Sequence, residues 1–291
     1  MSLKKLDPIV VGYDGSPGSR AALRWAVAEA VRQLSPLRLV EVFEPGPVGY
    51  PSADQVPLAG LRKVQERALD TLTDSIRLQH PQLAVDSVLV DGFAASSLID
   101  ESAHARLSVL GTRGHGGWTG ILLGSVANQV SMHSAGPVVV VPAASRPRVQ
   151  DKPTIVVGVD GSKASTKAID FAFAQAEDRG ARVVAVIVTP HPAPIFTGGL
   201  GLVIFDPADA ANEDRILVSE SLAGAGTDYP DVESEIRLMT GHPAQALVLA
   251  AENAELLVVG SRGRAGFASL LLGSVSLSVL HHAQCPVAIV R

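Results

Sequence analysis

One sequence pattern occurs twice in this chain, and the duplication constrains the fold more than any other feature. The segment Ile9–Ser16 (IVVGYDGS) returns as Ile155–Ser162 (IVVGVDGS), at an offset of 155 − 9 = 146 residues. A glycine-rich motif that begins at Gly111 returns at Gly260, at an offset of 260 − 111 = 149 residues. A repeat of this kind indicates a duplicated structural unit. We therefore predict two similar domains, residues 1–146 and 147–291.

The length of the chain agrees with this division, because 291 residues accommodate two domains that each bury their own core. The seam between the repeats, residues 142–153, contains three prolines among several charged residues. Such a composition is typical of an exposed linker. A net gain of three residues, 149 − 146, separates the two offsets, so the second half is expected to be slightly longer between its first strand and its glycine motif.

Composition excludes several classes of protein. No apolar run approaches the roughly 20 residues that a membrane-spanning helix needs. The apolar stretch behind Lys4 and Lys5 is only Ile9–Val11, which is too short for a signal peptide. The single cysteine, Cys285, cannot form an internal disulfide, so a reducing cytoplasm is expected. The net charge of −5 and the aromatic content of 4% argue against nucleic acid and membranes as partners.

Each half alternates short apolar, β-branched runs with segments of helical periodicity. In the first half this pattern predicts strands at 9–11, 37–43, 85–90, 107–110 and 137–141, and helices near 17–34, 61–80, 96–105 and 125–134. The second half is expected to repeat this order. Strict alternation predicts an α/β fold with a parallel sheet and helices on both faces. Loops at the carboxyl ends of such strands converge, so we expect Asp14, the proline-rich loop after Val42 and the Gly111 loop to meet at one crevice.

The glycine motif has the spacing Gly-x2-Gly-x9-Gly-Ser in both halves. Glycines let backbone N–H groups approach an anion closely, and the following helix N-terminus favours negative charge. We expect Gly111, whose counterpart is Gly260, to leave its strand in a conformation that a Cβ atom would forbid. The alternative is a glycine-rich turn followed by a Gly-Ser helix cap. The predicted phosphate cradle comprises Gly111, Thr112, Arg113, Gly114, His115, Gly116, Gly117, Gly124, Ser125 and Val126, and Gly260, Ser261, Arg262, Gly263, Arg264, Ala265, Gly266, Gly273, Ser274 and Val275.

Asp14 and Asp160 end the first strand of each half. Each carboxylate has two readings: it caps the next helix within an Asp-Gly-Ser turn, or it contacts a ribose hydroxyl, a base edge or a cation. Gly12 and Gly158, two residues earlier, either leave space for a ligand or permit close sheet–helix packing. Among the cradle residues, Arg113 and Arg262 either meet phosphate oxygens or remain solvated.

The motifs of several enzyme classes are absent from the sequence. There is no P-loop lysine motif, no dinucleotide-binding fingerprint after the first strand and no Gly-x-Ser-x-Gly elbow. The histidines have no metal-ligand spacing. His115 has Arg264 as its counterpart, which argues against a catalytic role shared by both halves. We therefore expect a site that binds its ligand and at most hydrolyses it weakly, and we assign no catalytic and no metal-ligating residue.

Taken together, these residues resemble the universal stress protein family in its tandem-domain, ATP-binding branch. The resemblance covers nearly the whole chain and rests on three segments of the first half and their repeats. These are the strand and turn from Val11 to Ser16, the glycine motif from Gly111 to Ser125, and the closing segment from His133 to Val140.

The resemblance implies, for each half, five parallel strands in the order 3-2-1-4-5 and one bound ATP. A divalent cation such as Mg²⁺ or Mn²⁺ would be held mainly by the phosphates, and Val42 or Val188 would lie beside the adenine. One departure is visible, because the histidine that such proteins often carry late in the second strand is Glu41 in the first half and Ile187 in the second.

The function implied is that of a cytoplasmic, nucleotide-dependent regulator or sensor in stress or dormancy responses, acting on a protein partner that the sequence does not identify. Two alternatives remain open: a slow ATPase that uses Asp14 and a cation, and an interaction module without nucleotide. The apolar last strands, 137–141 and 286–290, also predict a pseudo-dimer of the two halves and leave room for a homodimer.

Overall fold

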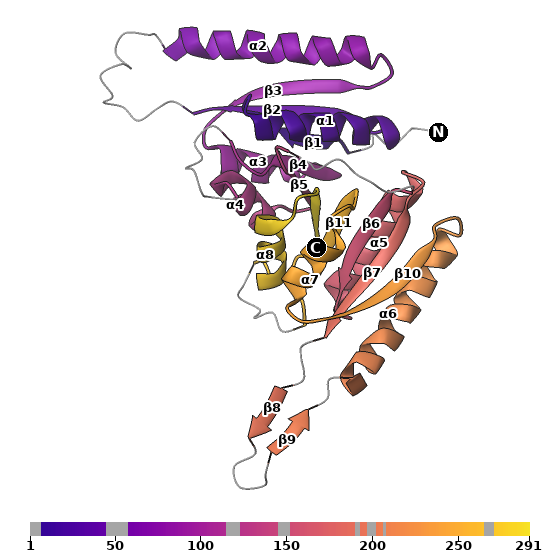
Figure 1. Ribbon diagram of the computed structural model, residues 1–291. Coiled ribbons are helices and arrows are strands. Elements are labelled where there is room, and N and C mark those ends of the chain that lie inside the picture. Colours follow the sequence, from indigo (N-terminus) through magenta and orange to yellow (C-terminus); the bar gives the residue numbers. More distant parts are fainter. Residues whose placement is uncertain are drawn as a thin grey trace. The chain divides into compact units, whose positions relative to one another are not determined.

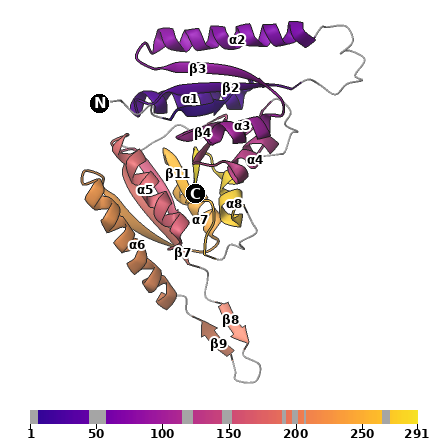
Figure 2. The same cartoon turned by 180° about the vertical axis from the view of Figure 1, so that it is seen from behind.

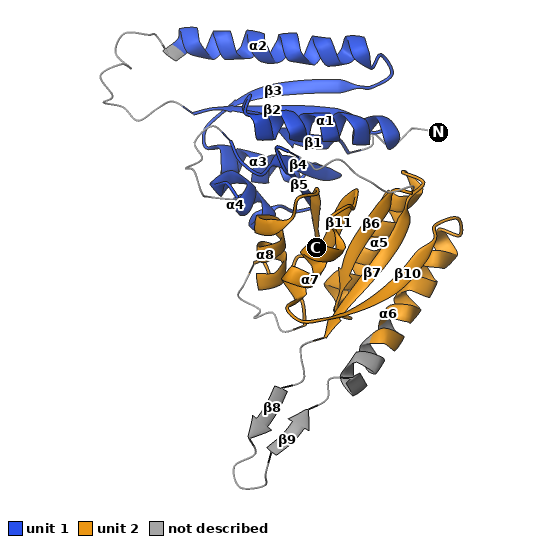
Figure 3. Ribbon diagram, in the orientation of Figure 1, with its two compact units in different colours: residues 1–144 blue, residues 145–291 orange. Residues whose placement is uncertain are grey.

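The computed structural model describes residues 7–44, 58–114, 123–144, 152–189, 193–196, 202–205, 208–264 and 271–291 (Figure 1). It divides the chain into two compact units, residues 1–144 and 145–291 (Figure 3). The division falls two residues before the boundary expected from the repeat. Most of the predicted linker, residues 145–151, lies outside the described part of the chain. Among the described helices, none is both long and apolar enough to span a bilayer.

The first unit is a parallel sheet whose strands pair in the order β3-β2-β1-β4-β5. Its strands are β1 (Ile9–Gly12), β2 (Leu37–Phe43), β3 (Val85–Asp91), β4 (Leu107–Gly111) and β5 (Val138–Val141). Its helices are α1 (Pro17–Arg32), α2 (Leu58–Gln79), α3 (Ala94–Ser102) and α4 (Ser125–His133). Right-handed crossovers place α1 and α2 on one face and α3 and α4 on the other. Helix α2 begins three residues earlier than the helix predicted at 61–80, so the loop before it is shorter than expected.

The second unit repeats this arrangement with the strand order β10-β7-β6-β11-β12. Its strands are β6 (Thr154–Val159), β7 (Arg182–Thr189), β10 (Ser234–Thr240), β11 (Leu256–Gly260) and β12 (Val287–Val290). Its helices are α5 (Lys163–Glu177), α6 (Ala208–Asp228), α7 (Pro243–Ala250) and α8 (Ser274–His282), and the same elements can be followed from behind in Figure 2. The predicted α/β fold and the strand order 3-2-1-4-5 are thus confirmed in both units.

One element departs from the expected repeat. An antiparallel hairpin, β8 (Ala193–Phe196) with β9 (Leu202–Phe205), lies in the chain between β7 and α6. The first half has no described counterpart, because residues 45–57 lie outside the described part of the chain. The hairpin falls within the stretch where the offset grows from 146 to 149 residues, so the second half diverges from a strict copy at this point.

The core strands and the helix starts follow from the sequence. All four residues of β1 are buried, as expected for an apolar run covered on both faces. Ser16 caps α1 by accepting a hydrogen bond from the backbone N–H of Ser19, and Ser162 caps α5 in the same way. These caps set where each helix begins after the first strand, and so they position the first turn of α1 or α5 beside the crevice expected from the sequence.

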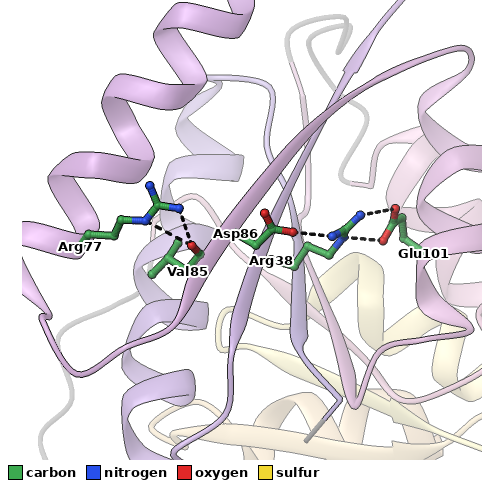
Figure 4. A network of polar contacts seen from close by, with 5 residues as sticks. All are labelled: Arg38, Arg77, Val85, Asp86 and Glu101. Carbon is green, nitrogen blue, oxygen red and sulfur yellow. Dashed lines mark hydrogen bonds and ion pairs between the residues drawn. The ribbon is translucent and has the colours of Figure 1, made fainter. Parts of the chain in front are cut away.

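A polar network ties β2, β3 and α3 together near the amino ends of the strands (Figure 4). Arg38, the second residue of β2, donates from Nε to Glu101 of α3 at 2.8 Å and also pairs with Asp86 of β3. Arg77, near the end of α2, donates to the carbonyl oxygen of Val85 at 2.7 Å. Hydrogen bonds to Glu101 raise the pKa of the Arg38 guanidinium, so it stays charged. The network holds the scaffold and lies at the opposite end of the strands from the predicted crevice.

Candidate functional site

The carboxyl edge of the first sheet holds a cleft of about 620 Å³. It is walled by the ends of β1, β2 and β4 and by the first residues of α3 and α4. The structure therefore brings together the loops that parallel-sheet topology predicts to meet. The predicted site residues that line the cleft are Gly12, Asp14, Val42, Gly111, Thr112, Arg113, Gly114, Gly124, Ser125 and Val126. His115, Gly116 and Gly117 lie outside the described residues, as does most of the loop after Val42.

Several cleft residues were not predicted from the sequence. They are Tyr13, Ser19, Val40, Phe43, Glu44, Gln65, Ala94, Leu98, Leu110 and Ala127. Most are neighbours of predicted residues along the same strand or helix. Four residues are different, because they come from helices on which no site residue was predicted: Ser19 of α1, Gln65 of α2, and Ala94 and Leu98 of α3. The only signal for Gln65 in the sequence is topological, since α2 follows β2 and must cover its end.

Asp14 connects two loops at the floor of the cleft. Its Oδ1 accepts from the backbone N–H of Ser16 at 3.0 Å, which is the local turn that the sequence allowed. A Cβ atom added at Gly114 would lie 2.5 Å from Asp14 Oδ2, so the glycine loop passes directly over the carboxylate. The turn reading of Asp14 is confirmed, and its second carboxylate oxygen lies against the glycine loop.

The second unit shows the same arrangement in full. Asp160 Oδ1 accepts from the N–H of Ser162 at 3.0 Å, and its Oδ2 accepts from the N–H of Arg264 at 2.9 Å. The Arg264 guanidinium lies over Gly161, whose backbone has a φ of 72°. Each carboxylate oxygen thus holds a different loop. Asp160 acts as a clamp between the first strand of its unit and the glycine loop.

The expectation that Gly111 adopts a conformation forbidden to other residues is wrong. Neither Gly111 nor its counterpart Gly260 is among the glycines with positive φ in the described chain. A Cβ atom at Gly111 would lie 2.6 Å from the carbonyl oxygen of Gly18, and one at Gly260 would lie 2.9 Å from Cβ of Ala164. These glycines are required for space, because the first turn of α1 or α5 packs against the end of the fourth strand.

Gly12 and Gly158 are explained by the second of their two interpretations, close packing of a helix against the sheet. A Cβ atom at Gly12 would lie 2.6 Å from Leu110 and 3.0 Å from Leu98. A Cβ atom at Gly158 would lie 2.9 Å from Leu247, the counterpart of Leu98 on α7. Gly12 also lines the cleft, so close packing of the helix against the sheet and an open cleft floor coincide at this residue.

The N-termini of three helices, α1, α3 and α4, reach the cleft, and side chains of the protein cap the first two. In α1, Ser16 accepts from Ser19 N–H at 3.1 Å and donates to the carbonyl oxygen of Arg113 at 3.2 Å. In α4, the cap residue Gly124 has no side chain to offer. The first-turn N–H groups of a helix have no intrahelical partner, and in α4 they belong to Ser125 and the two residues after it, which line the cleft. The N-terminus of α4 therefore presents to the cleft the donors and the partial positive charge that favour an anion.

The geometry of α4 repeats in α8. Gly273 caps α8 without a side-chain hydrogen bond, and its N–H donates to the carbonyl oxygen of Ser261 at 2.7 Å. In the first unit Gly124 N–H donates to Thr112 at the same distance. Each glycine loop is thus bonded to the start of the helix that follows it. Both halves therefore present a helix start without a side-chain cap at the carboxyl edge of their sheet.

At the other end of the first cleft, Glu41 and Gln65 form a buried polar pair. Gln65 Nε2 donates to Glu41 Oε1 at 2.6 Å, and Glu41 is only 9% exposed. Burial raises the pKa of the Glu41 carboxyl, the hydrogen bond from Gln65 lowers it, and the negative charge of Asp14 raises it further. Nearby, Glu44 Oε1 accepts from the N–H of Ala94 at 2.7 Å and so caps α3, whose own cap residue has no suitable side chain.

The second site has a different charge distribution. Ile187 of β7 stands where Glu41 stands in the first unit, so the buried carboxylate is missing there. Burial and the charge of Arg262 lower the pKa of Arg291, which follows β12 directly. The predicted residues of this unit that the structure describes are Gly158, Asp160, Val188, Gly260, Ser261, Arg262, Gly263, Arg264, Gly273, Ser274 and Val275. Ala265 and Gly266 lie outside the described residues.

Comparison with known protein families identifies one match. The model described as the universal stress protein family matches the chain twice, at residues 5–142 and 153–291. A universal stress protein of Mycolicibacterium smegmatis is 35% identical over 289 residues, covering 97% of this chain and 96% of that protein. A universal stress protein of Mycobacterium tuberculosis is 34% identical over 291 residues, again covering 97% of this chain and 96% of the relative.

Solved structures share the fold. A universal stress protein from Archaeoglobus fulgidus superposes with a TM-score of 0.71 at 20% identity and covers 99% of both chains. A functionally unknown protein from Pseudomonas aeruginosa superposes with a TM-score of 0.65 at 15% identity, covering 98% of this chain and 92% of the other. At these identities the likeness establishes the fold alone.

Proposed function

Because the chain belongs to the universal stress protein family, we propose that it binds ATP at the carboxyl edge of each sheet and acts as a cytoplasmic, nucleotide-dependent regulator or sensor in stress or dormancy responses. The main support for this proposal is the difference between the two ends of the first cleft. One end presents the uncapped start of α4 and the glycine loop, and the other end is formed by β2. An anion-binding end joined to a partly apolar end suits a nucleotide.

The phosphates would lie on the loop Gly111–Gly114 and on the first turn of α4. Hydrogen bonds to a charged group contribute about 1.5–3 kcal/mol each, and a partly buried helix N-terminus adds up to ~2 kcal/mol. Three or four such bonds with a stacked or enclosed base reach the roughly 8 kcal/mol of micromolar affinity. The base would lie against Val42 and Phe43, and the ribose would lie between the two ends, near Asp14.

A divalent cation, Mg²⁺ or Mn²⁺, would be held mainly by the phosphates. The part of the chain that the structure describes contains no group of three His, Cys, Asp or Glu side chains placed to hold a metal. Asp14 is the carboxylate nearest to the expected phosphates, and the backbone N–H of Ser16 already engages one of its oxygens. Its second oxygen faces the glycine loop, so Asp14 contributes more as a support for that loop than as a metal ligand.

Mass spectrometry of nucleotide released from the purified protein tests the proposal directly. We expect ATP, with up to two molecules per chain, and a matching response in a calorimetric titration. Gly114→Ala should remove binding at the first site because the new Cβ meets Asp14 Oδ2. Gly60→Ala is the matched control, since a Cβ there would have no neighbour within 4 Å.

Two outcomes would favour the other functions. Steady ATP turnover that Asp14→Ala abolishes, with nucleotide binding retained, would identify a slow ATPase. The absence of any released adenine nucleotide, together with no response to added ATP, would identify an interaction module without nucleotide. Turnover at the level of the uncatalysed reaction with tight binding supports the regulator.

A further inference from the structure

We propose that Gln65 determines the base specificity of the first site, because Glu41 orients its side-chain amide so that Oε1 faces the cleft and selects a purine with a 6-amino group. In the second site Ile187 stands where Glu41 stands in the first, so this orienting carboxylate is missing there. The inference rests on the proposed function, since it takes the cleft to hold a nucleotide, and it adds a residue and a mechanism of discrimination that neither the glycine motif nor the family match assigns.

The position of Gln65 links the helical layer to the cleft. The residue belongs to α2, crosses to the end of β2 and lines the cleft. Its Nε2 is bonded to Glu41 at 2.6 Å. Glu41 itself is buried and does not line the cleft, so it acts on a ligand only through Gln65. Glu41 is therefore a positioning residue, and Gln65 is the group that meets the ligand.

The chemistry of the pair fixes the direction of the amide. An ionised carboxylate accepts hydrogen bonds and cannot donate one, so the NH₂ group of Gln65 must face Glu41. The carbonyl oxygen of the same amide then points away from Glu41. An acceptor at this place matches the exocyclic amine of adenine, which donates. It opposes the carbonyl oxygen that guanine and hypoxanthine carry at the same ring position, because two acceptors repel each other.

The base end of the cleft is located by exclusion. The anion-binding groups belong to β4, its loop and the start of α4, which places the phosphates there. Strands β4 and β2 flank β1, and adjacent strands lie about 4.8 Å apart, so the β2 end lies roughly 10 Å from the phosphates. That separation suits a nucleoside laid across β1. Val42, Phe43 and Gln65 form the wall at that end.

The second unit provides an internal comparison. Ile187 replaces Glu41, so no carboxylate orients an amide on the matching helix. Asp214 occupies the sequence position of Gln65, at 214 − 65 = 149 residues. The described residues of the second unit therefore contain no equivalent of the Glu41–Gln65 hydrogen bond. The carboxylate that orients the amide in the first site therefore has no counterpart in the second.

The test compares three triphosphates in the full chain: ATP, ITP with its 6-carbonyl, and purine riboside triphosphate, which has no group at position 6. Calorimetry is done in a Gly263→Ala background, because a Cβ at Gly263 meets Asp160 Oδ2 and blocks the second site. We expect ATP to bind roughly five- to tenfold more tightly than purine riboside triphosphate, the range that one neutral hydrogen bond supplies. ITP should bind more weakly still.

Three variants assign the effect. Gln65→Leu should weaken ATP to the level of purine riboside triphosphate and leave the analogue unchanged. Glu41→Gln should shrink the preference for ATP over ITP, because the amide of Gln65 is then free to reverse. Gln79→Leu, the same substitution at the far end of α2, should change neither ratio.

The outcomes separate the two levels of the proposal. If Gln65→Leu leaves the ratio of ATP to analogue unchanged, or weakens all three ligands equally, Gln65 does not read the base. If Gln65→Leu still alters the ratio in a Gly114→Ala background, where only the second site remains, the effect does not come from this cleft. If the wild-type chain binds none of the three triphosphates, the proposed function itself fails.

Discussion

Asp160 shows how one carboxylate holds a local turn and a distant loop at the same time. In Asp160, one oxygen accepts from the local turn and the other from the glycine loop, 104 residues further along the chain. The local cap was predictable from the Asp-Gly-Ser sequence, whereas the second bond depends on where the loop after β11 returns. The turn reading is confirmed, and the contact with a ligand stays a prediction. Under the proposed function the carboxylate would also act by holding the glycine loop in place.

The clamp predicts a measurable effect on stability and binding. Asp14→Ala should lower the free energy of unfolding by about 1 kcal/mol, because it removes a turn hydrogen bond at a helix start. It should also weaken ATP binding at the first site, since the glycine loop loses its support. Urea denaturation and calorimetry measure the two effects. Asp70→Ala, an exposed aspartate on α2, is the control, and an equal loss of stability there would contradict the clamp.

Glu41 predicts a pH dependence of stability. Burial raises the pKa of its carboxyl in the folded protein above the ordinary value of 4.5. The folded state then holds this proton more tightly than the unfolded state, so its stabilising effect is present below pH 4.5 and is lost as the pH rises through the folded pKa. The Glu41→Gln variant does not lose stability in this pH range, because a glutamine side chain does not titrate. The stability of Glu41→Gln relative to wild type should grow from pH 4.5 upward and then level off, as followed by urea denaturation at each pH.

Leu34 carries the one positive φ, 48°, among the described residues other than glycine. Its counterpart is Gly180, whose φ is 58°, and the left-handed conformation costs a residue with a Cβ about 1–2 kcal/mol. Leu34 is 82% exposed, so its replacement loses little packing. Relief of this strain is partly offset, because glycine has more conformational freedom to lose when the chain folds. The net effect of Leu34→Gly should be to stabilise the first unit by roughly 0.5 kcal/mol. Gly180→Leu should destabilise the second, and thermal unfolding of both variants checks the opposite signs.

At the scale of elements, most of the fold was predictable from the sequence. Apolar β-branched runs located the strands, and caps such as Ser16 and Ser162 located the helix starts. The order 3-2-1-4-5 was expected from the family resemblance, since periodicity alone does not order strands within a sheet. The hairpin β8–β9 was not predicted, because it lies in a stretch where the two halves differ in length and no repeat could be compared.

The cleft was predictable where a motif marks it and not elsewhere. The glycines and the aspartate form motifs with a recognisable spacing, so the cleft residues around β1, β4 and α4 could be predicted from the sequence. Gln65 could not, because its place in the cleft depends on how α2 packs at the end of β2 and on its hydrogen bond to Glu41. The reason assigned to Gly111 was also wrong, since tight packing against α1 requires its missing Cβ and no unusual backbone angle is involved.

The network around Arg38 belongs to the elements and not to the cleft. Arg38→Met should remove its bonds to Glu101 and Asp86 and lower stability by about 1 kcal/mol, the upper range for a partly exposed ion pair. ATP affinity should not change, because the network lies at the amino ends of the strands. A double-mutant cycle of Arg38→Met with Glu101→Gln measures the coupling. A change in affinity would show that the scaffold and the cleft are linked.

At the scale of the whole molecule, the duplication allows each site to be removed alone. A ligand at 100 times its dissociation constant stabilises the unit that binds it by about 2.7 kcal/mol. Gly114→Ala should abolish this gain for the first unit and Gly263→Ala for the second, each because its Cβ meets the aspartate below. Denaturation followed with and without ATP measures the gains. If either variant alone abolishes both gains, the two sites are not independent.

The replacement of Glu41 by Ile187 in the second copy has one further consequence. A chain with two identical sites would report only how much nucleotide surrounds it. If Gln65 selects the base at the first site and the second site, which has Ile187 in place of Glu41, is less selective, the chain would report composition as well. A pool of 6-amino purines would then fill the two sites to similar extents, whereas a pool of 6-oxo purines would fill the first site less than the second. The difference in occupancy between the two sites would compare two populations of molecules within one polypeptide, which a single domain does not permit.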